Sequence, residues 1–238
     1  MPKAVSLFSG CGGSDAGVIA AGFEVVMAND ILAYARDVYV ANHPATDYRL
    51  GNIAGIQSFP AAELLIGCYP CQGFSQGGVR DPSRKINTLY LEFGRALQQI
   101  RPKAFIVENV SGMVRANFAH LLKDQFRVFS EAGYRVKAEV LNASNYGVAQ
   151  ERRRIFIVGL RDDLGIEYSF PIPTHGPGRG TPHFTLAEAL KNMRHWPNSD
   201  EYYTRDFHWY YLSRDRYRGC SEVSPTIVAH TQHMSFHP

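Results

Sequence analysis

Short runs of β-branched and apolar residues alternate with longer stretches of helical spacing through the first part of the chain. The apolar runs predict strands over 4–8, 24–28, 63–68 and 103–107, and a closing pair over 134–143 and 154–160. Helical spacing predicts helices over 14–22 (beginning with a serine cap), 31–42, 87–100 and 117–132. Strand–helix alternation of this kind is typical of an α/β fold with a parallel, doubly wound sheet.

The remainder of the chain has a different composition. The segment FPIPTHGPGRGTPH is rich in proline and glycine, which indicates a linker. Residues 184–238 are polar, aromatic and rich in arginine, with weak periodicity. We therefore expect two domains, one over residues 1–170 and one over 171–238.

The overall composition is that of an ordinary globular protein, with 45% hydrophobic and 20% charged residues. No apolar stretch approaches the ~20 residues that a membrane span requires. The first residues, MPKAVSLFSG, carry no secretory signal pattern, so we expect a cytoplasmic protein with no membrane partner. The net charge of +3 permits a nucleic acid as partner without requiring one.

Polar residues follow each of the first four predicted strands. In open α/β sheets, ligands bind at the carboxyl ends of the strands, so these residues are expected to form one active site. In chain order they are the SGCGG turn, Asn29 with Asp30, the segment from Cys68 to Ser75, and Glu108 with Asn109.

The glycine turn after the first strand predicts a cofactor site. Gly10, Gly12 and Gly13 permit a tight turn and a close backbone approach to a ligand, at the start of a helix. Asp30 follows at the end of the second strand, where an acid accepts hydrogen bonds from ribose hydroxyls. Since the full G-x-G-x-x-G pattern is missing, a smaller adenosine cofactor is favoured over a dinucleotide.

Cys68 and Cys71 flank Tyr-Pro in the segment GCYPCQGFSQGG. Such a pair is compatible with a redox couple, with half of a zinc site, or with a single nucleophilic thiol. The glycine-rich, basic segment that follows favours Cys71 as a nucleophile acting on a polyanionic substrate. Cys68, at the end of an apolar strand, is expected to be a small buried residue.

Two further charged segments are candidates for chemistry. Glu108 ends the apolar run AFIVENV, where desolvation would raise the carboxyl pKa, although a helix-capping acid is the alternative. In QERRR, strand alternation places Arg152 and Arg154 on one face and Arg153 on the other. A solvated charge run would explain one such arginine better than three.

Taken together, these segments resemble the DNA (cytosine-5) methyltransferases. LFSGCGGSDAG is similar to the cofactor loop of that family, GCYPCQGFSQGG to its nucleophile block, and ENV to its glutamate block. QERRRIFIVG is similar to its Gln-x-Arg-x-Arg block, and NTLYLEF to the segment that leaves the catalytic loop. The resemblance implies a Rossmann-like, S-adenosylmethionine-dependent methyltransferase sheet with a partial C-terminal target-recognition region.

The resemblance also implies an activity. A methyl group is transferred from S-adenosylmethionine to carbon 5 of a cytosine flipped out of double-stranded DNA, leaving S-adenosylhomocysteine, with no metal required. The implied catalytic residues are Cys71, which attacks carbon 6, Glu108, which shares a proton with ring N3, Arg154, which binds the exocyclic oxygen, and Arg152, which helps hold the flipped nucleotide.

Binding residues follow from the same blocks and from the basic loop. The expected cofactor-binding set is Phe8, Gly10, Gly12, Gly13, Asp30, Ile31, Asn52, Ile53, Pro70 and Leu89. The expected DNA-binding set is Gln72, Ser75, Arg80, Arg84, Lys85 and Gln150.

The sequence departs from the family pattern in two places. Asn52 stands where an aspartate usually binds the adenine amino group, which predicts weaker cofactor binding without its loss. After SPTIVAHTQHMSFHP the two closing blocks of the family are absent, so we expect a second polypeptide that supplies them, or a truncated sequence. A degenerate, inactive copy is disfavoured by the intact catalytic residues.

Three functional interpretations are compared below: the DNA enzyme, a transfer-RNA cytosine-5 methyltransferase, and a non-catalytic DNA-binding subunit of a split methyltransferase. The compact length suggests a bacterial or phage origin.

Overall fold

The computed structural model describes residues 1–70, 88–114, 118–193 and 218–227. The chain divides into two compact units, the first comprising Met1–Val140 and Arg154–Phe170 and the second Leu141–Arg153 and Pro171–Pro238. The predicted nucleophile Cys71 lies outside the described residues, as do Gln72, Ser75, Arg80, Arg84 and Lys85.

A single seven-stranded sheet organises the described residues, in the order β3-β2-β1-β4-β5-β7-β6. Its strands are β1 (Lys3–Leu7), β2 (Glu24–Asp30), β3 (Asp47–Leu50), β4 (Leu64–Gly67), β5 (Ala104–Val110), β6 (Tyr134–Asn142) and β7 (Arg153–Arg161). The neighbours among β1 to β5 pair in parallel, whereas β7 is antiparallel to β5. The α/β prediction is confirmed, with a sheet that is mixed at one side.

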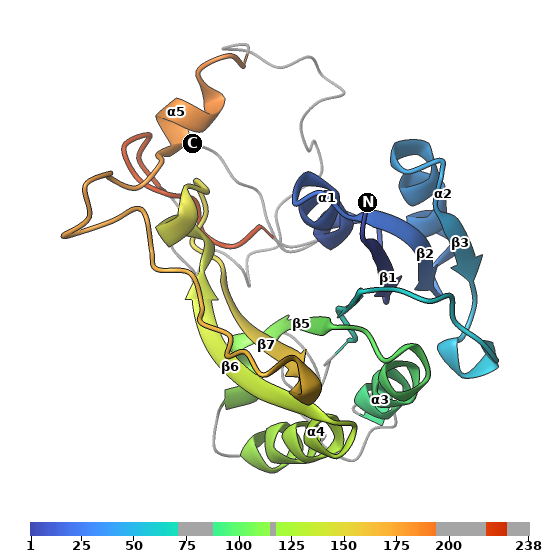
Figure 1. The fold of residues 1–238 in the computed structure, drawn as a ribbon. Helices are drawn as coiled ribbons and strands as arrows, with labels where there is room; N and C mark the ends of the chain where they lie inside the picture. The colour runs from blue at the N-terminus through green and yellow to red at the C-terminus, as the bar shows by residue number, and fades with distance from the viewer. Residues whose placement is uncertain (71–87, 115–117, 194–217, 228–238) are drawn as a thin grey trace. The chain divides into compact units, whose positions relative to one another are not determined.

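Helices cover both faces of this sheet (Figure 1). α1 and α2 lie on one face, and α3 and α4, which pack against each other, lie on the opposite face. The bounds of these helices are α1 (Gly13–Ala20), α2 (Ala33–Asn42), α3 (Leu89–Ile100) and α4 (Ala119–Glu131). Short 3-10 turns join the elements: η1 (Ile53–Gly55), η3 (Ser111–Val114), η5 (Ala143–Tyr146) and η6 (Asp162–Leu164).

The core forms two clusters because successive strand residues point to opposite faces. Phe105 of β5 belongs to the larger cluster, whereas its neighbours Ala104 and Ile106 contact the smaller one. The Phe105 ring meets Phe93 of α3 and Phe129 of α4 edge-on, with centroids 5.8 and 4.9 Å apart. Burial of both strand faces explains why the strands are continuous apolar runs in the sequence.

Three details differ from the prediction. Strand β3 was not expected, because its four residues are charged or half-exposed and lack an apolar pattern. Helix α1 begins at Gly13 with Gly12 as its N-cap, so the predicted serine cap is wrong; the Ser14 hydroxyl instead donates to Asp15 Oδ1 at 3.1 Å. β2 extends to Asp30 and β5 to Val110, so the polar residues predicted after these two strands lie within them.

The second unit is held together by the pairing of its two segments. Glu151 N donates to Ser224 O at 2.7 Å, and Ser224 N donates to Ala149 O at 2.9 Å. Helix α5 (Leu186–Leu190) begins with a capping box formed by Thr185 and Glu188. No helix within the described ranges is long and apolar enough to cross a membrane.

Candidate active site

Strand register brings the predicted site residues of the first unit to one edge of the sheet. Leu7 of β1 lies opposite Asn29 of β2 on one side and opposite Gly67 of β4 on the other. Gly67 in turn lies opposite Val107 of β5. The next residue of each strand therefore falls in one row across the carboxyl edge, and this row contains Asp30, Phe8, Cys68 and Glu108.

The glycine turn and Asp30 are directly joined. The Asp30 carboxylate accepts a hydrogen bond from Gly10 N at 2.9 Å through Oδ2, and one from Leu32 N at 3.0 Å through Oδ1. Phe8 and Gly10 both adopt left-handed backbone angles, with φ of 57° and 53°. A non-glycine residue rarely adopts this conformation, so its occurrence at Phe8 is consistent with a functional turn. The sequence-based link between the turn and Asp30 therefore has a structural counterpart.

Asn29 holds the ends of three neighbouring strands together, a role that the sequence did not reveal. Its buried side-chain amide donates to Arg49 O at 2.7 Å and to Gly51 O at 3.0 Å. Its main-chain carbonyl accepts from Ser9 N at 3.0 Å. The amide thereby fixes the segment that leads from β3 to Asn52. A buried asparagine at the end of an apolar strand was the available signal.

The predicted adenine-binding segment follows β3. Asn52 is exposed, and its Oδ1 accepts from Ala54 N at 3.0 Å, which caps η1. Ile53 is buried in the larger core cluster, whereas Ile31, at the end of β2, is 65% exposed. Leu89 begins α3 and is partly buried against the same cluster.

Two groups near the row have raised pKa values. Burial raises the pKa of the Cys68 thiol to about 12, and the Glu108 carboxylate contributes in the same direction. The raised pKa keeps the Cys68 thiol neutral at physiological pH, but the residue is half-buried and not fully buried as expected. Burial, followed by the nearby Asp30 carboxylate, also raises the pKa of Tyr48, whose hydroxyl has no hydrogen-bond partner among the described residues.

The segment that leads to Cys71 is braced by two buried amides. Asn109 Nδ2 of β5 donates to the main-chain carbonyl of Tyr69 at 3.1 Å. The Tyr69 hydroxyl donates to Gln125 Oε1 of α4 at 2.5 Å. Pro70, the last described residue before the predicted nucleophile, follows directly. Asn109 was noted in the sequence only as a polar neighbour of Glu108, and Gln125 was not noted.

Glu108 and Arg154 form an ion pair across the antiparallel strands. Arg154 Nε lies 3.0 Å from Glu108 Oε1, and the two side chains are 19% and 25% exposed. The geometry follows from register, since Arg154 lies opposite Val110, two residues beyond Glu108 on the same face of β5. The pair lies at the carboxyl end of β5, in line with the row described above.

The other two residues of the Gln-x-Arg-x-Arg block belong to the second unit. Arg152 N donates to Asn142 Oδ1 at 3.0 Å, and Gln150 forms an isolated β-bridge with Ser224. Arg152 and Arg154 are partly buried while Arg153 is exposed, which agrees with the predicted alternation.

The residues present at the edge fit S-adenosylmethionine. A carboxylate lies at the end of β2, beside a glycine turn whose Gly10 and Gly13 have open space where a side chain would lie. An exposed apolar side chain (Ile31) and an exposed amide (Asn52) complete a set of polar and apolar groups suited to an adenosine. Among the described residues, no group of three or more His, Cys, Asp and Glu side chains is arranged to hold a metal ion.

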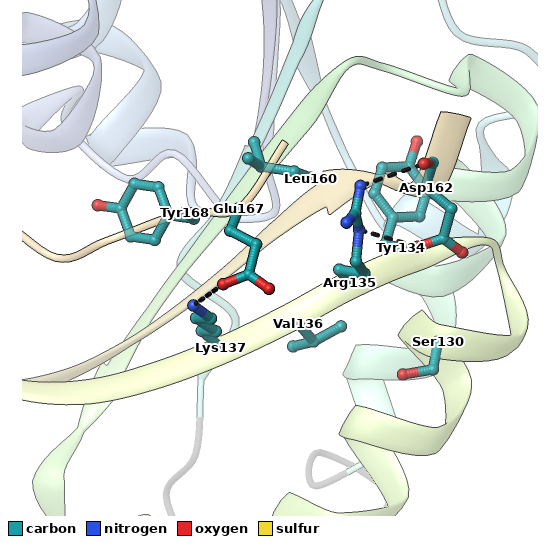
Figure 2. Close-up of a pocket in the computed structure, with 9 residues that line it drawn as sticks. All are labelled: Ser130, Tyr134, Arg135, Val136, Lys137, Leu160, Asp162, Glu167 and Tyr168. Atoms are coloured by element: carbon teal, nitrogen blue, oxygen red, sulfur yellow. Dashed lines mark hydrogen bonds and ion pairs between the residues drawn. The ribbon is translucent and has the colours of Figure 1, made fainter. Parts of the chain in front are cut away.

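A cavity of about 480 Å³ lies elsewhere in the first unit, between α4, β6, the end of β7 and the segment that follows it (Figure 2). Its charged side chains are paired: Lys137 with Glu167 at 3.2 Å and Arg135 with Asp162 at 3.7 Å. Leu160, which lines it, lies opposite the first residue of β5. The cavity is therefore at the opposite end of β5 from Glu108, and it is not part of the candidate site.

Comparison with known families agrees with this geometry. The sequence model of the C-5 cytosine-specific DNA methylases matches residues 2–229. The chain belongs to this family. The seven-stranded sheet with helices on both faces is accordingly an α/β methyltransferase fold.

The chain is similar to several curated members of the methylase family. It is 38% identical to the type II methyltransferase M.BspRI of Lysinibacillus sphaericus, over 91% of this chain and 51% of that protein. It is 34% identical to the type II methyltransferase M.BsuRI of Bacillus subtilis, over 98% of this chain and 60% of that protein. The chain thus spans only about half to three-fifths of the length of these two relatives.

Solved structures show the same fold. A candidate DNA modification methyltransferase encoded within an E. coli prophage superposes with a TM-score of 0.69 at 25% identity, over 82% of this chain and 56% of that chain. The expected α/β methyltransferase sheet is therefore confirmed at the level of both sequence family and structure.

Proposed function

We propose that this chain carries the catalytic part of a DNA (cytosine-5) methyltransferase, which methylates carbon 5 of a cytosine flipped out of double-stranded DNA. The observation that supports this proposal most directly is the row at the carboxyl edge of the sheet. In that row the Asp30 carboxylate, which would bind a ribose, lies along the same edge as the end of β4, which leads to Cys71, and the Glu108–Arg154 pair. Cofactor and base would thus meet at one edge.

The cofactor half comprises the glycine turn, the end of β2 and the segment after β3. Asp30 would accept hydrogen bonds from the ribose hydroxyls, and Phe8 would stack on the adenine ring. The exposed Asn52 side chain would accept a hydrogen bond from the adenine amino group. Its Oδ1 already accepts one backbone hydrogen bond but has a second lone pair. Gly10, Gly12, Gly13, Ile31, Ile53, Pro70 and Leu89 would complete the pocket. When bound, S-adenosylmethionine supplies an activated methyl group.

The base half would activate cytosine by addition to its ring. The Cys71 thiolate would form a bond with carbon 6, and the electron pair of the 5,6 double bond would be delocalised over carbon 5 and ring N3, which gives an enamine. A proton shared between Glu108 and ring N3 would neutralise the charge that develops, and Arg154 would stabilise the exocyclic oxygen. Carbon 5 would then be nucleophilic and would take the methyl group, which leaves S-adenosylhomocysteine. Loss of the carbon 5 proton to solvent or a base would restore the 5,6 double bond as the carbon–sulfur bond breaks, and would release the Cys71 thiolate.

DNA would be held by the cationic segment after Cys71 and by the second unit. The proposed contacts are with phosphates and with the flipped nucleotide, from Gln72, Ser75, Arg80, Arg84, Lys85, Gln150 and Arg152. Their contribution would appear as a salt-dependent affinity.

Transfer of labelled methyl groups from S-adenosylmethionine to unmethylated duplex DNA tests the proposal. We expect incorporation, by the purified chain or after addition of a polypeptide that carries the closing family blocks, that is abolished by Cys71→Ser and retained by Cys68→Ala, because the Cys68 thiol is neutral. Equal loss in both variants would contradict a single nucleophile and would favour a cysteine pair. The same assay with transfer RNA tests the alternative substrate, which the DNA methylase relatives do not favour.

Covalent trapping distinguishes a catalytic role from a non-catalytic DNA-binding role. Duplex DNA that contains 5-fluorocytosine should form a stable adduct with the chain, since fluorine at carbon 5 cannot leave as a proton does. Absence of the adduct, even after addition of a polypeptide that carries the closing family blocks, would support the non-catalytic role. Adduct formation only after that addition would support the second polypeptide, which stays a prediction.

The Asn52 departure has its own test. Titration of S-adenosylhomocysteine into the unmodified chain and into Asn52→Asp should show tighter binding by the variant, because a carboxylate is a stronger acceptor for the adenine amino group.

Bacterial relatives support a bacterial or phage origin and a cytoplasmic location, and their type II designation supports a role in restriction–modification.

A further inference from the structure

Arg95 makes an unusual set of contacts for a helix-surface arginine. It lies on α3, and three of its N–H groups are directed to different acceptors. Nη2 donates to Ile53 O at 2.9 Å and Nη1 donates to Ile56 O at 3.0 Å. Nε donates to Glu92 Oε2 at 2.8 Å, one turn back on the same helix.

The two carbonyls belong to the segment that carries Asn52 and Ile53. Ile53 begins η1 and Ile56 follows it. The Ile53 carbonyl also accepts from Ile56 N at 3.0 Å, so the guanidinium adds a second donor to this carbonyl and a donor to that of Ile56, at the carboxyl end of the turn. A planar fork suits two carbonyls at once, which a lysine ammonium cannot match. The guanidinium also lies over the Phe59 ring, 5.4 Å from its centroid, which fixes its plane.

Other hydrogen bonds hold the beginning of this segment. Gly51 N donates to Asp30 O at 2.9 Å, and Gly51 O accepts from Asn29 Nδ2 at 3.0 Å. Asn52 caps the start of η1 through its own side chain. The segment is therefore anchored to β2 at one end and to α3, through Arg95, at the other. Without Arg95, the carbonyls of Ile53 and Ile56 would lose these two hydrogen bonds, and the nearest side-chain tether would be that of Arg49 Nη1 to Ser58 O, at 3.0 Å.

We propose that Arg95 is a positioning residue for the adenine end of the cofactor site. By holding the carbonyls of Ile53 and Ile56, it fixes the backbone of Asn52 and Ile53 and thereby orients the exposed Asn52 side chain toward the adenine ring. This assignment rests on the proposed function, in which Asn52 and Ile53 contact the cofactor. Arg95 contacts no reacting atom, so its effect is on cofactor affinity and not on the chemical step.

A matched arginine separates this role from ordinary helix stabilisation. Arg127 on α4 forms the same type of ion pair, with Nη2 2.6 Å from Asp124 Oδ1 three residues earlier, and also contacts Glu131. These two acidic residues, Asp124 and Glu131, belong to its own helix, whereas Arg95 donates to the carbonyls of another segment. Removal of Arg127 therefore tests the loss of a helix ion pair without a change at η1.

The experiment is calorimetric titration of S-adenosylhomocysteine into the unmodified protein, Arg95→Lys, Arg95→Met and Arg127→Met. We expect the Kd to rise about tenfold in both Arg95 variants, which corresponds to about 1.4 kcal/mol, and to stay unchanged in Arg127→Met. In methyl transfer, the KM for S-adenosylmethionine should rise while kcat at saturating cofactor and the KM for DNA change little. Glu92→Gln should produce a smaller rise, because it removes only the charge of the acceptor for Nε and leaves both carbonyl contacts in place.

An adenine-specific readout sharpens the test. S-inosylhomocysteine carries an oxygen in place of the amino group, so the unmodified protein should discriminate against it, and Arg95→Lys should discriminate less. Equal Kd values for the unmodified protein and both Arg95 variants would overturn the role of Arg95 alone. A loss of kcat without a change in KM would also overturn it. No binding by the unmodified protein would overturn the proposed function and, with it, this assignment.

Discussion

Replacement of Tyr69 by phenylalanine should destabilise the protein through a single buried hydrogen bond. The Tyr69 hydroxyl and Gln125 Oε1 are 2.5 Å apart, and the two residues are 2% and 1% exposed. The bond joins the segment before Cys71 to α4. Tyr69→Phe keeps the ring and its contacts with Phe8 and Phe93, so only the hydroxyl is lost.

The expected cost follows from burial. A buried carbonyl that loses its donor costs about 1–3 kcal/mol, because water cannot replace the missing partner. Gln125 retains only a weak contact of its amide with Met113 Sδ at 3.8 Å, so the lower end of the range is not expected. With an m value of about 2.5 kcal/mol/M, a loss of about 2 kcal/mol lowers the urea midpoint by about 0.8 M.

Urea denaturation followed by far-ultraviolet circular dichroism measures this loss, with Tyr34→Phe as the control because Tyr34 is 69% exposed. Gln125→Met alone should cost a similar amount, since it strands the hydroxyl. The double variant Tyr69→Phe with Gln125→Met removes both polar groups and should be less destabilised than either single variant. Additive costs in the double variant would refute the reasoning.

Further predictions concern two residues of the row, Glu108 and Cys68, and a buried hydrogen bond between α1 and α2. Glu108→Gln should lower kcat for methyl transfer by about 10²- to 10⁴-fold in single-turnover assays, as expected for loss of a proton donor, and an unchanged rate would exclude that role. Cys68, with its pKa of about 12, should be alkylated by iodoacetamide at pH 8 at least about 100-fold more slowly than the exposed Cys11, as peptide mapping can show. Because that pKa is raised from 9.0, the stabilisation by the neutral Cys68 thiol is complete below about pH 9 and is lost between pH 9 and 12. Tyr39→Phe should cost about 1.5–3 kcal/mol in urea unfolding, since its hydroxyl donates to Asp15 Oδ2 at 2.6 Å between two fully buried residues, and a cost below about 0.5 kcal/mol would contradict this.

The sequence by itself predicted most strands and helices and named the candidate residues, although it missed β3. Apolar runs and helical spacing reflect burial of strand faces and helix stripes, which are local properties of the chain. The link between the glycine turn and Asp30 was also visible, because residues at the ends of neighbouring parallel strands must meet. Block order then led to the methylase family.

Tertiary structure decided how these elements support the site. The antiparallel placement of β7 brings Arg154 beside Glu108, although the two are 46 residues apart in the numbering, and no local pattern specifies that register. The contacts of Asn29, Gln125 and Arg95 likewise join residues that are 20 to 56 positions apart. A polar side chain in the sequence shows only that a partner is needed; which partner it finds depends on the packing of distant elements, because hydrogen bonds require specific distances and angles.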